Sequence, residues 1–276
     1  MTLATLSDVL QPALRDGYAV AGLVTLGWED MRAYVAAAEA ECVPVILQAG
    51  PSCRAHTPLA IIGKMFRHLA ENASVPVVAH LDHGYTFDEC KEALDAGFTS
   101  LMFDGSRKPL RQNIDQTAAI AEMAHAAGIS CEGEIGFVGY AGGEDSSGTD
   151  PVEAAQFARD TGVDAMAISV GNLHLQQSTG GGLDEARIRA IEAATTVPLV
   201  VHGGSGVSLA QRRTLALESN ICKFNIGTEV RMAFGEALRS SVNRDPTRFD
   251  RVAILKETHD PVVEATRRIL AVLKRR

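Results

Sequence analysis

The sequence lacks paired cysteines and long apolar runs. Its five cysteines stand singly, with no C-x-x-C spacing, which favours reduced thiols over a disulfide framework. No apolar run approaches the ~20 residues needed to span a bilayer. Residues 1–16 contain acids and no long apolar core, so no signal peptide is expected. These absences predict a soluble, cytoplasmic protein that does not bind membranes.

An excess of positive charge is also missing. The formal net charge is -8, which argues against nucleic-acid binding because phosphate backbones require a basic face. A local cationic pocket for a phosphorylated metabolite remains compatible with this charge. No linker, low-complexity segment or internal repeat divides the 276 residues, so we expect a single domain over residues 1–276.

The chain does contain a regular alternation of short apolar runs and helical patterns. This order predicts an α/β fold, a single (β/α)8 TIM barrel with extra C-terminal helices, and a doubly wound open sheet is the competing architecture. The expected strands are Tyr18–Leu26, Pro44–Gln48, Val75–Leu81, Ser100–Phe103, Ser130–Ile135, Ala165–Val170, Pro198–Val201 and Ile221–Asn225.

Three of these strands are followed by a histidine, namely His83, His174 and His202. The carboxyl ends of barrel strands meet on one face, where such enzymes build their sites. Three neutral imidazoles leave an open coordination position, as a catalytic zinc requires, although iron, manganese or cobalt would also suit. The alternative is three ordinary half-buried histidines bonded to backbone.

Carboxylates accompany the histidines. Asp82 would face away from His83 along a regular strand, but it becomes the candidate acid/base group if the strand end turns there; otherwise it caps or orients a neighbour. Asp104 and Glu134 end two further strands and are either auxiliary metal ligands or carboxylates that orient the histidines. Glu132 shares the direction of Glu134.

Two glycine-containing turns and one long loop complete the pattern. The turns follow the last two strands, where backbone N–H groups and a helix N-terminus can hold a phosphate; plain turn chemistry is the alternative. The loop, Gly142–Gly148, is either a mobile lid that brings a carboxylate to the site or a solvated acidic loop. The proposed phosphate-binding residues are Gly203, Gly204, Ser205, Asn225, Ile226, Gly227 and Thr228.

Five motifs resemble the class II, zinc-dependent ketose-bisphosphate aldolases, which include the fructose- and tagatose-1,6-bisphosphate enzymes. They occur in order over most of the chain: His80-Leu81-Asp82-His83-Gly84, Leu101–Ser106, Glu132–Gly136, His202-Gly203-Gly204-Ser205-Gly206 and Lys223–Thr228.

The resemblance implies a glycolytic type of lyase that cleaves a phosphorylated ketose to dihydroxyacetone phosphate and an aldehyde. It implies one Zn²⁺ held by His83, His174 and His202, with Asp104 and Glu134 matching carboxylates near the metal, and a second metal or a monovalent cation is a further option. Asp82 matches the acid/base residue, and Glu144, or Asp145, matches the lid carboxylate. The glycine turns match the cradle for dihydroxyacetone phosphate, and the family assembles as dimers or tetramers.

Four places depart from the family pattern. Ala21–Gly27 lacks the usual asparagines, and Ala49–Arg54 after the second strand is unusual. Gly171–Leu175 lacks a threonine and a closing glycine, and Gly227 stands where fructose-bisphosphate enzymes tend to carry aspartate. These differences leave the aldehyde half of the substrate open, including another ketose or a keto acid. A metal-dependent TIM-barrel hydrolase and a non-catalytic sugar-phosphate-binding protein are the competing functions.

Overall fold

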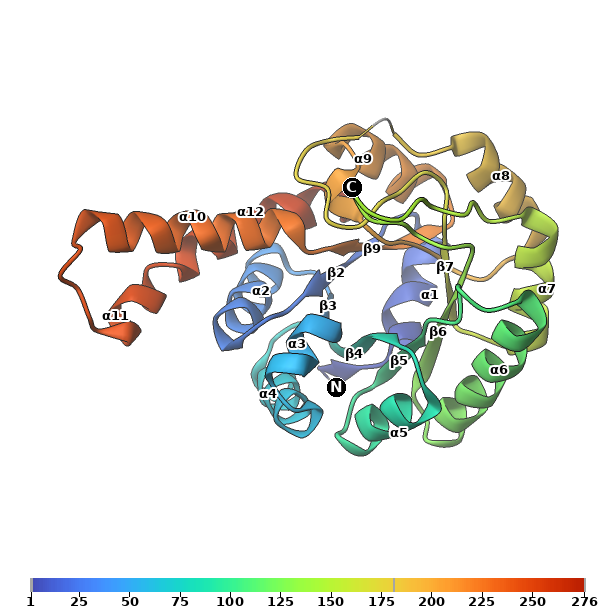
Figure 1. The fold of residues 1–276 in the computed structure, drawn as a ribbon, viewed down its shortest axis with the longest axis horizontal. Coiled ribbons are helices and arrows are strands. Elements are labelled where there is room, and N and C mark those ends of the chain that lie inside the picture. Colours follow the sequence, from blue (N-terminus) through green and yellow to red (C-terminus); the bar gives the residue numbers. More distant parts are fainter. Residues whose placement is uncertain (1, 181, 276) are drawn as a thin grey trace.

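The computed structural model describes residues 2–180 and 182–275, and eight parallel strands within them close into a barrel (Figure 1). Consecutive strands pair from β2 to β9; the pairs β4–β5 and β2–β9 complete the ring. The strands are β2 (Val20–Val24), β3 (Val45–Ala49), β4 (Val77–Gly84), β5 (Ser100–Phe103), β6 (Ser130–Ile135), β7 (Ala165–Ile168), β8 (Leu199–Val201) and β9 (Ile221–Ile226). The predicted barrel is therefore confirmed.

Helices follow the strands and cover the outside of the barrel (Figure 1). They are α1 (Leu6–Asp16), α2 (Trp28–Glu41), α3 (Pro51–His56), α4 (Leu59–Asn72), α5 (Phe87–Asp95), α6 (Leu110–Ala126), α7 (Pro151–Thr161), α8 (Glu185–Ala194), the 3₁₀ turn η1 (Gly204–Gly206), α9 (Leu209–Glu218), α10 (Thr228–Arg244), α11 (Arg251–Lys256) and α12 (His259–Leu273). The extra C-terminal helices expected from the sequence are α11 and α12.

Alternation along the strands separates the barrel interior from the helix-facing layer. Val20, Ile46 and Val78 form one buried cluster with Leu6 and Leu10 of α1. Because successive strand residues point to opposite faces, this cluster fills the lower interior, and α1 closes that end. The site is thereby confined to the opposite end, where the strands finish.

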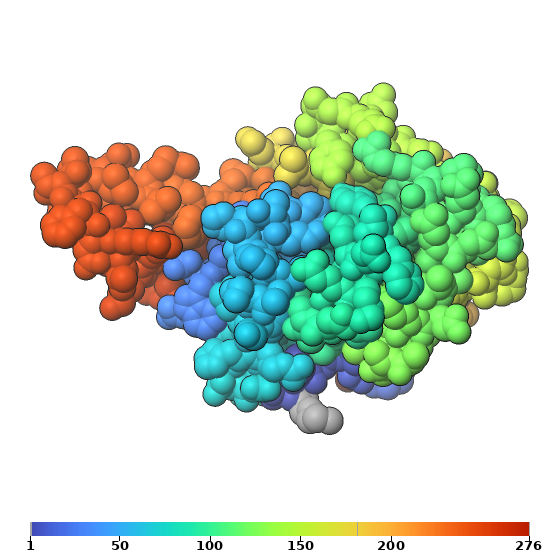
Figure 2. All heavy atoms as spheres, turned by 60° about the horizontal axis from the view of Figure 1, so that its bottom comes forward, coloured from blue at the N-terminus to red at the C-terminus, as the bar shows by residue number. Residues whose placement is uncertain are grey.

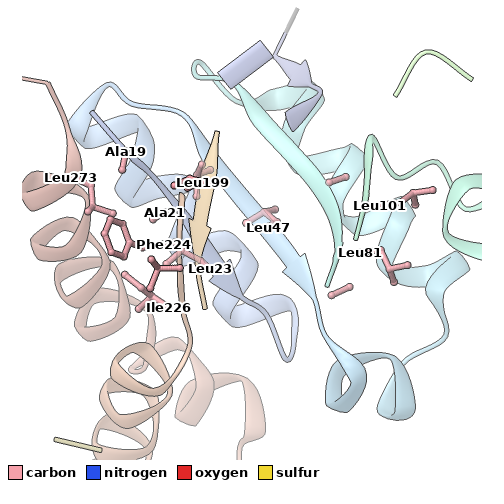
Figure 3. Packing of buried hydrophobic residues seen from close by; sticks show 14 of the residues in the cluster. Ala19, Ala21, Leu23, Leu47, Leu81, Leu101, Leu199, Phe224, Ile226 and Leu273 are labelled. Carbon is pink, nitrogen blue, oxygen red and sulfur yellow. The ribbon is translucent and has the colours of Figure 1, made fainter. Parts of the chain in front are cut away.

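The larger buried cluster lies between the strands and the surrounding helices. Figure 3 shows part of it, with Ala19, Ala21 and Phe224 gathered toward Leu273 of α12. Glu41 of α2 accepts hydrogen bonds from the side chains of Arg267 and Lys274 at 2.9 and 2.7 Å. Apolar contact and these ion pairs together dock the last helix against the barrel.

Element boundaries differ from the expectation by a few residues at several strands, and three short elements were not predicted. The two-residue strand β1 (Leu3–Ala4), which pairs with β4, and the short helices α3 and α11 were not predicted individually. The strand expected to end at Leu81 continues to Gly84. This extension matters because it carries Asp82 and His83 into the sheet edge that forms the site.

Helices α10, α11 and α12 extend beyond the barrel as an arm (Figure 1), which Figure 2 shows as a separate lobe. Met232, Val252 and Phe249 on this arm are exposed, Phe249 by 93%. Among the described helices, none combines the length and apolarity needed to cross a bilayer.

Candidate metal and substrate site

The three predicted histidines meet at the carboxyl end of the barrel. His83 ends β4, His202 follows β8 and His174 lies in the segment after β7. Ring centroids are 4.7 Å apart for His83 and His202, 5.2 Å for His83 and His174, and 5.7 Å for His174 and His202. One ring nitrogen of each lies within 4.8 Å of the other two. The arrangement suits a single ion with three imidazole ligands.

His83 reaches this position through an unusual backbone conformation. Its φ is +54°, and the pairing register between β4 and β5 shifts between Leu81 and Gly84. The turn that the acid/base role of Asp82 requires is therefore present. Both Asp82 and His83 line the same pocket, instead of pointing to opposite faces of the strand.

Arg54 of α3 holds this strand end. Its guanidinium donates to the carbonyl oxygens of Asp82 at 2.9 Å and His83 at 2.5 Å. No role was predicted for Arg54 from the sequence, although the segment Ala49–Arg54 departs from the family pattern. Its contacts satisfy buried carbonyl groups and stabilise the left-handed turn.

Hydrogen bonds fix which nitrogen of His83 faces the site. Nδ1 donates to Oδ2 of Asp104 at 2.8 Å, so Nε2 is left as the ligand atom. Burial alone would lower the pKa of His83, but the carboxylates of Asp82 and Asp104 outweigh burial and raise the pKa to about 9. Of the two roles predicted for Asp104, this geometry favours the orienting one.

Glu132 orients the ring of His202. Nε2 of His202 donates to Oε1 of Glu132 at 3.1 Å, while Nδ1 is buried and has no hydrogen-bond partner among the described residues. Burial keeps the pKa of His202 well below its usual value. A neutral imidazole with a free, inward nitrogen is what a metal ligand requires.

His174 comes from a loop and is held by its neighbour Tyr140. The two rings stack with centroids 4.9 Å apart, and backbone hydrogen bonds join His174 to Gly139 and Ala141 at 2.8 and 3.0 Å. Burial, followed by the charge of His83, lowers the pKa of His174 to about 3. This imidazole too is neutral at physiological pH.

Glu134 supplies a further test of the cation hypothesis. Its Oε2 is buried without a partner among the described residues, 3.3 Å from Nδ1 of His202. Burial, aided by the charge of Asp104, raises the pKa of Glu134 to about 8. An orphaned carboxylate oxygen beside an orphaned imidazole nitrogen fits a bound cation, which would compensate both. The residues present therefore fit the metal centre predicted from the sequence, and His83, Asp104 and Glu134 form a second candidate group.

Asp82 is placed for proton transfer beside the histidines. Its Oδ1 accepts from Nε2 of Gln48 at 3.1 Å and Nδ2 of Asn225 at 3.3 Å, and lies 3.9 Å from Nε2 of His83. Gly22 makes room for Gln48, because a Cβ at Gly22 would lie 2.2 Å from Oε1 of that side chain. Oε1 of Gln48 and Oδ1 of Asn225 are buried and find no partner in the described part of the chain.

A buried polar network lies under the histidines. Lys223, completely buried, donates to Oε2 of Glu132 at 2.6 Å and to Nε2 of His80 at 3.1 Å. His80 in turn contacts Oγ of Ser100 at 2.8 Å through Nδ1. No role was predicted for Lys223. The feature of the sequence that could have indicated one is a charged residue inside an otherwise apolar strand. His80 thus links Lys223 to Ser100 beneath the histidines and is not one of the clustered imidazoles.

The glycine turns after β8 and β9 lie side by side. Gly203 has a left-handed φ of +64° and starts the turn η1, and Oγ of Ser205 accepts from the backbone N–H of Glu229 at 3.4 Å. A Cβ at Gly204 would approach the carbonyl oxygen of Asn225 to 3.0 Å, so glycine permits this close contact. Of the predicted cradle, Gly203, Ser205, Asn225, Gly227 and Thr228 line the pocket, whereas Gly204 and Ile226 are buried behind it.

The predicted lid residue lies apart from the histidines. Glu144 is 55% exposed and forms a bidentate ion pair with Arg107 at 2.9 and 2.6 Å. It is not among the described residues that line the pocket, and neither is the exposed Asp145. The structure brings together Asp82, the histidines and the cradle, but not the lid carboxylate.

The shared pocket has an empty volume of about 920 Å³, including space open to solvent. A parallel barrel with three clustered imidazoles, a partnered acid and a glycine cradle at its carboxyl end defines an α/β-barrel enzyme with a candidate metal centre. The family described as "Fructose-bisphosphate aldolase class-II" matches residues 4–276. The chain belongs to this family, and it is an aldolase, a lyase of the metal-dependent class.

Individual relatives agree with this assignment. The chain is 36% identical over 270 residues to a fructose-bisphosphate aldolase of Geobacillus stearothermophilus, covering 95% of this chain and 93% of the relative. It is also 36% identical over 267 residues to a 6-phospho-5-dehydro-2-deoxy-D-gluconate aldolase of Shouchella clausii, covering 93% and 89%. The crystal structure of the YdjI aldolase from Escherichia coli K12 superposes with a TM-score of 0.86 at 29% identity, covering 99% and 98% of the two chains.

Proposed function

We propose that this chain is a zinc-dependent aldolase acting in the cytoplasm as one domain over residues 1–276. It reversibly cleaves a phosphorylated ketose, of the fructose- or tagatose-1,6-bisphosphate type, to dihydroxyacetone phosphate and an aldehyde. The observation that carries this proposal is the unpartnered, buried Nδ1 of His202 beside His83 and His174 in the described part of the chain, with Asp82 next to them. The fructose-bisphosphate aldolase activity named for the Geobacillus relative supports the substrate class.

In this proposal His83, His174 and His202 hold zinc. Zinc bound there would supply positive charge that stabilises an enediolate. Asp104 keeps His83 in the right tautomer, and Glu134 lies close enough to offer an oxygen to zinc or to a second cation. Nearby carboxylates of this kind usually raise ligand basicity and fix ring orientation.

Asp82 moves the proton that C–C cleavage requires. It accepts the proton of the C4 hydroxyl while the C3–C4 bond breaks; the bonding electron pair stays with the C1–C3 fragment as the enediolate, and C4 becomes the aldehyde carbon. Condensation runs the same transfer backwards. Gln48 and Asn225 hold the carboxylate in place.

The glycine turns hold the phosphate of the three-carbon fragment. Backbone N–H groups near Gly203 and Ser205, together with the N-terminus of α10 at Gly227 and Thr228, provide donors and a favourable dipole. Glu144 then protonates the enediolate carbon after the loop moves and the Arg107 ion pair opens.

A phosphorylated keto acid is a second substrate class. The Shouchella relative carries the name of an aldolase for 6-phospho-5-dehydro-2-deoxy-D-gluconate, which combines a phosphate and a carboxylate. Val24 stands in the pocket, in the strand segment that departs from the usual family sequence. The name of this relative favours including acidic aldehydes among the products, and the departure around Val24 leaves that half of the substrate open.

We also propose a homodimer or homotetramer. The arm of α10, α11 and α12 carries exposed apolar side chains, with Met232 and Val252 exposed by 51% and 60%, and surfaces of this kind commonly pack against another chain. Light scattering coupled to size-exclusion chromatography measures the state directly.

The deciding experiment measures metal content together with dihydroxyacetone phosphate release. Fructose-1,6-bisphosphate, tagatose-1,6-bisphosphate and 6-phospho-5-dehydro-2-deoxygluconate are assayed with and without chelator, followed by zinc add-back. We expect about one zinc per chain, consistent with one three-imidazole site, and chelator-sensitive cleavage of at least one substrate. His202→Ala should lose zinc and activity together. Release of inorganic phosphate without C–C cleavage would instead support a hydrolase.

A further inference from the structure

Arg231 is the one lysine or arginine among the described residues that line the site pocket. It lies in the first turn of α10, and its backbone N–H donates to the carbonyl oxygen of Gly227 at 3.0 Å. Its Nε is buried and has no hydrogen-bond partner among the described residues. A pocket proposed to bind a multiply charged substrate thus contains a single guanidinium, which is not satisfied within the described chain.

Nearby carboxylates do not account for this guanidinium. Asp30 is close enough for Arg231 to influence its pKa, but Oδ2 of Asp30 accepts from the backbone N–H groups of Leu26 and Gly27 at 2.9 and 3.1 Å. No ion pair joins Arg231 to a carboxylate in the described part of the chain. Arg212, by contrast, pairs with Glu229 at 2.5 Å, so the acid closest in sequence to Arg231 is already engaged.

Arg231 lies next to Gly227 of the proposed phosphate cradle, and both line the pocket. A Cβ at Gly227 would lie 3.2 Å from Cβ of Val24 and 3.8 Å from Nε of Arg231. Arg231 therefore lies close to the turn that is proposed to hold the phosphate. Glycine at position 227 keeps a further side chain out of this contact, and the neighbouring Val24 is apolar, so a guanidinium here interacts with an anion more strongly than in water.

We propose that Arg231 binds an oxyanion of the substrate, either its phosphate or a carboxylate or phosphate on the aldehyde half. The planar guanidinium presents paired donors that match either group. This inference rests on the proposed function, since it names the substrate group that Arg231 recognises in the same pocket. It makes Arg231 a determinant of substrate choice.

The test measures ligand binding to the zinc-loaded protein by calorimetry, independently of turnover. Dihydroxyacetone phosphate reports on the phosphate of the three-carbon fragment, and glycerate reports on an acid at the other half. Arg231→Gln should weaken binding of at least one of them by roughly 10- to 100-fold, as expected for losing hydrogen bonds to a charged group. Arg231→Lys should retain part of that affinity because it keeps the charge.

Arg239→Gln is the matched control, because Arg239 lies on the same helix and is exposed outside the pocket. It should bind both ligands as the wild type does. A loss confined to dihydroxyacetone phosphate assigns Arg231 to the cradle phosphate, and a loss confined to glycerate assigns it to the aldehyde half.

Unchanged binding of both ligands in Arg231→Gln, with normal zinc content and melting temperature, overturns the proposal. So does a wild-type protein that binds neither ligand. Failure of the proposed function gives a different result. The zinc-loaded wild type would then cleave no ketose, whether or not its ligand binding depends on Arg231.

Discussion

The left-handed conformation of His83 shows how one residue rearranges the chemistry of a strand end. A regular strand would send the side chains of Asp82 and His83 to opposite faces. A φ of +54° costs a non-glycine residue about 1–2 kcal/mol, and Arg54 offsets part of this cost by bonding both carbonyl groups. The strain is placed where an acid and a proposed ligand must share one pocket.

Asp82→Asn tests the acid/base role at this strand end. Asparagine has nearly the same shape but cannot accept the hydroxyl proton, so we expect turnover to fall about 10²- to 10⁴-fold, the usual contribution of a positioned general base. Zinc content and melting temperature should stay near wild-type values. Steady-state kinetics with metal analysis decide the point, and undiminished turnover would mean that another group takes the proton.

Replacing Glu132 should lower the affinity of the site for zinc, although Glu132 is not a proposed ligand. It would act through the network that joins it to Lys223 and His202. Glu132→Gln weakens the acceptor of Nε2 of His202, which holds Nδ1 toward the site. Substitutions of such supporting carboxylates typically cost 10- to 100-fold in metal affinity. Competition with a zinc chelator measures the change, and the d–d spectrum of the cobalt-substituted protein reports altered ligand geometry.

A double variant separates this orienting role from stability. Glu132→Gln leaves the buried ammonium of Lys223 without its charge partner, which should destabilise the fold by about 3–5 kcal/mol. Adding Lys223→Met removes the orphaned charge and should restore much of the stability but not the zinc affinity. If zinc affinity recovers along with the melting temperature, Glu132 acts only through the fold.

The sequence reveals which polar residues stand inside apolar strands, but it does not predict which partners they contact. Alternation and strand-end position select His83, His202, Asp104 and Glu134 as candidates from the amino-acid sequence, and the fold brings them close together. Gln48 is buried within an otherwise apolar strand, and pattern alone does not say which neighbour it meets. Its partner Asp82 is 34 positions away, and that pairing depends on the register of the closed barrel.

At the scale of elements, the lid loop is more ordered than its glycines suggest. Phe137 and Ser147 pair as an antiparallel bridge, and Arg107 covers the ring of Phe137 at 4.2 Å from its centroid. The same arginine pairs with Glu144. The sequence predicts either a mobile lid or a solvated loop, and in the structure the loop carboxylate is exposed, is paired with Arg107 and is not among the described residues that line the pocket.

Glu144→Gln should separate the two proton transfers. If Glu144 serves the enediolate carbon, the variant slows deuterium exchange into dihydroxyacetone phosphate by about 10²-fold or more, with zinc binding unchanged. Asp145→Asn is the matched control, since it alters the neighbouring exposed carboxylate. The rates are measured by NMR in D₂O; a slower exchange in Asp145→Asn alone would transfer the role to Asp145.

Element prediction succeeded where periodicity is long and failed where elements are short. Eight strands and the helices between them follow from apolar runs and their stop signals. Strand β1 has two residues and α3 and α11 have six each, too few for a period to appear. Pro51 at the start of α3 was the available signal, because proline is favoured in the first helical turn.

At the scale of the molecule, the histidines join parts of the barrel that are distant along the chain. His83 ends β4, while His174 and His202 follow β7 and β8 on the other side of the ring. Between them β5 and β6 complete the wall. An ion shared by these three segments would tie opposite halves of the barrel together at its open end, where α1 gives no support.

Metal removal should therefore lower the stability of the whole barrel. A ligand that binds the folded state alone, at 100 times its Kd, stabilises it by about 2.7 kcal/mol. For a protein of this size that corresponds to a fall in Tm of roughly 5–10 °C when the metal is withdrawn. Calorimetry of zinc-loaded and chelator-treated wild type measures the shift, and His202→Ala, which lacks the third ligand, should melt at a temperature that chelator no longer changes. Equal melting temperatures for zinc-loaded and verified metal-free wild type would mean that zinc has no preference for the folded chain, which would contradict a site that the closed barrel assembles.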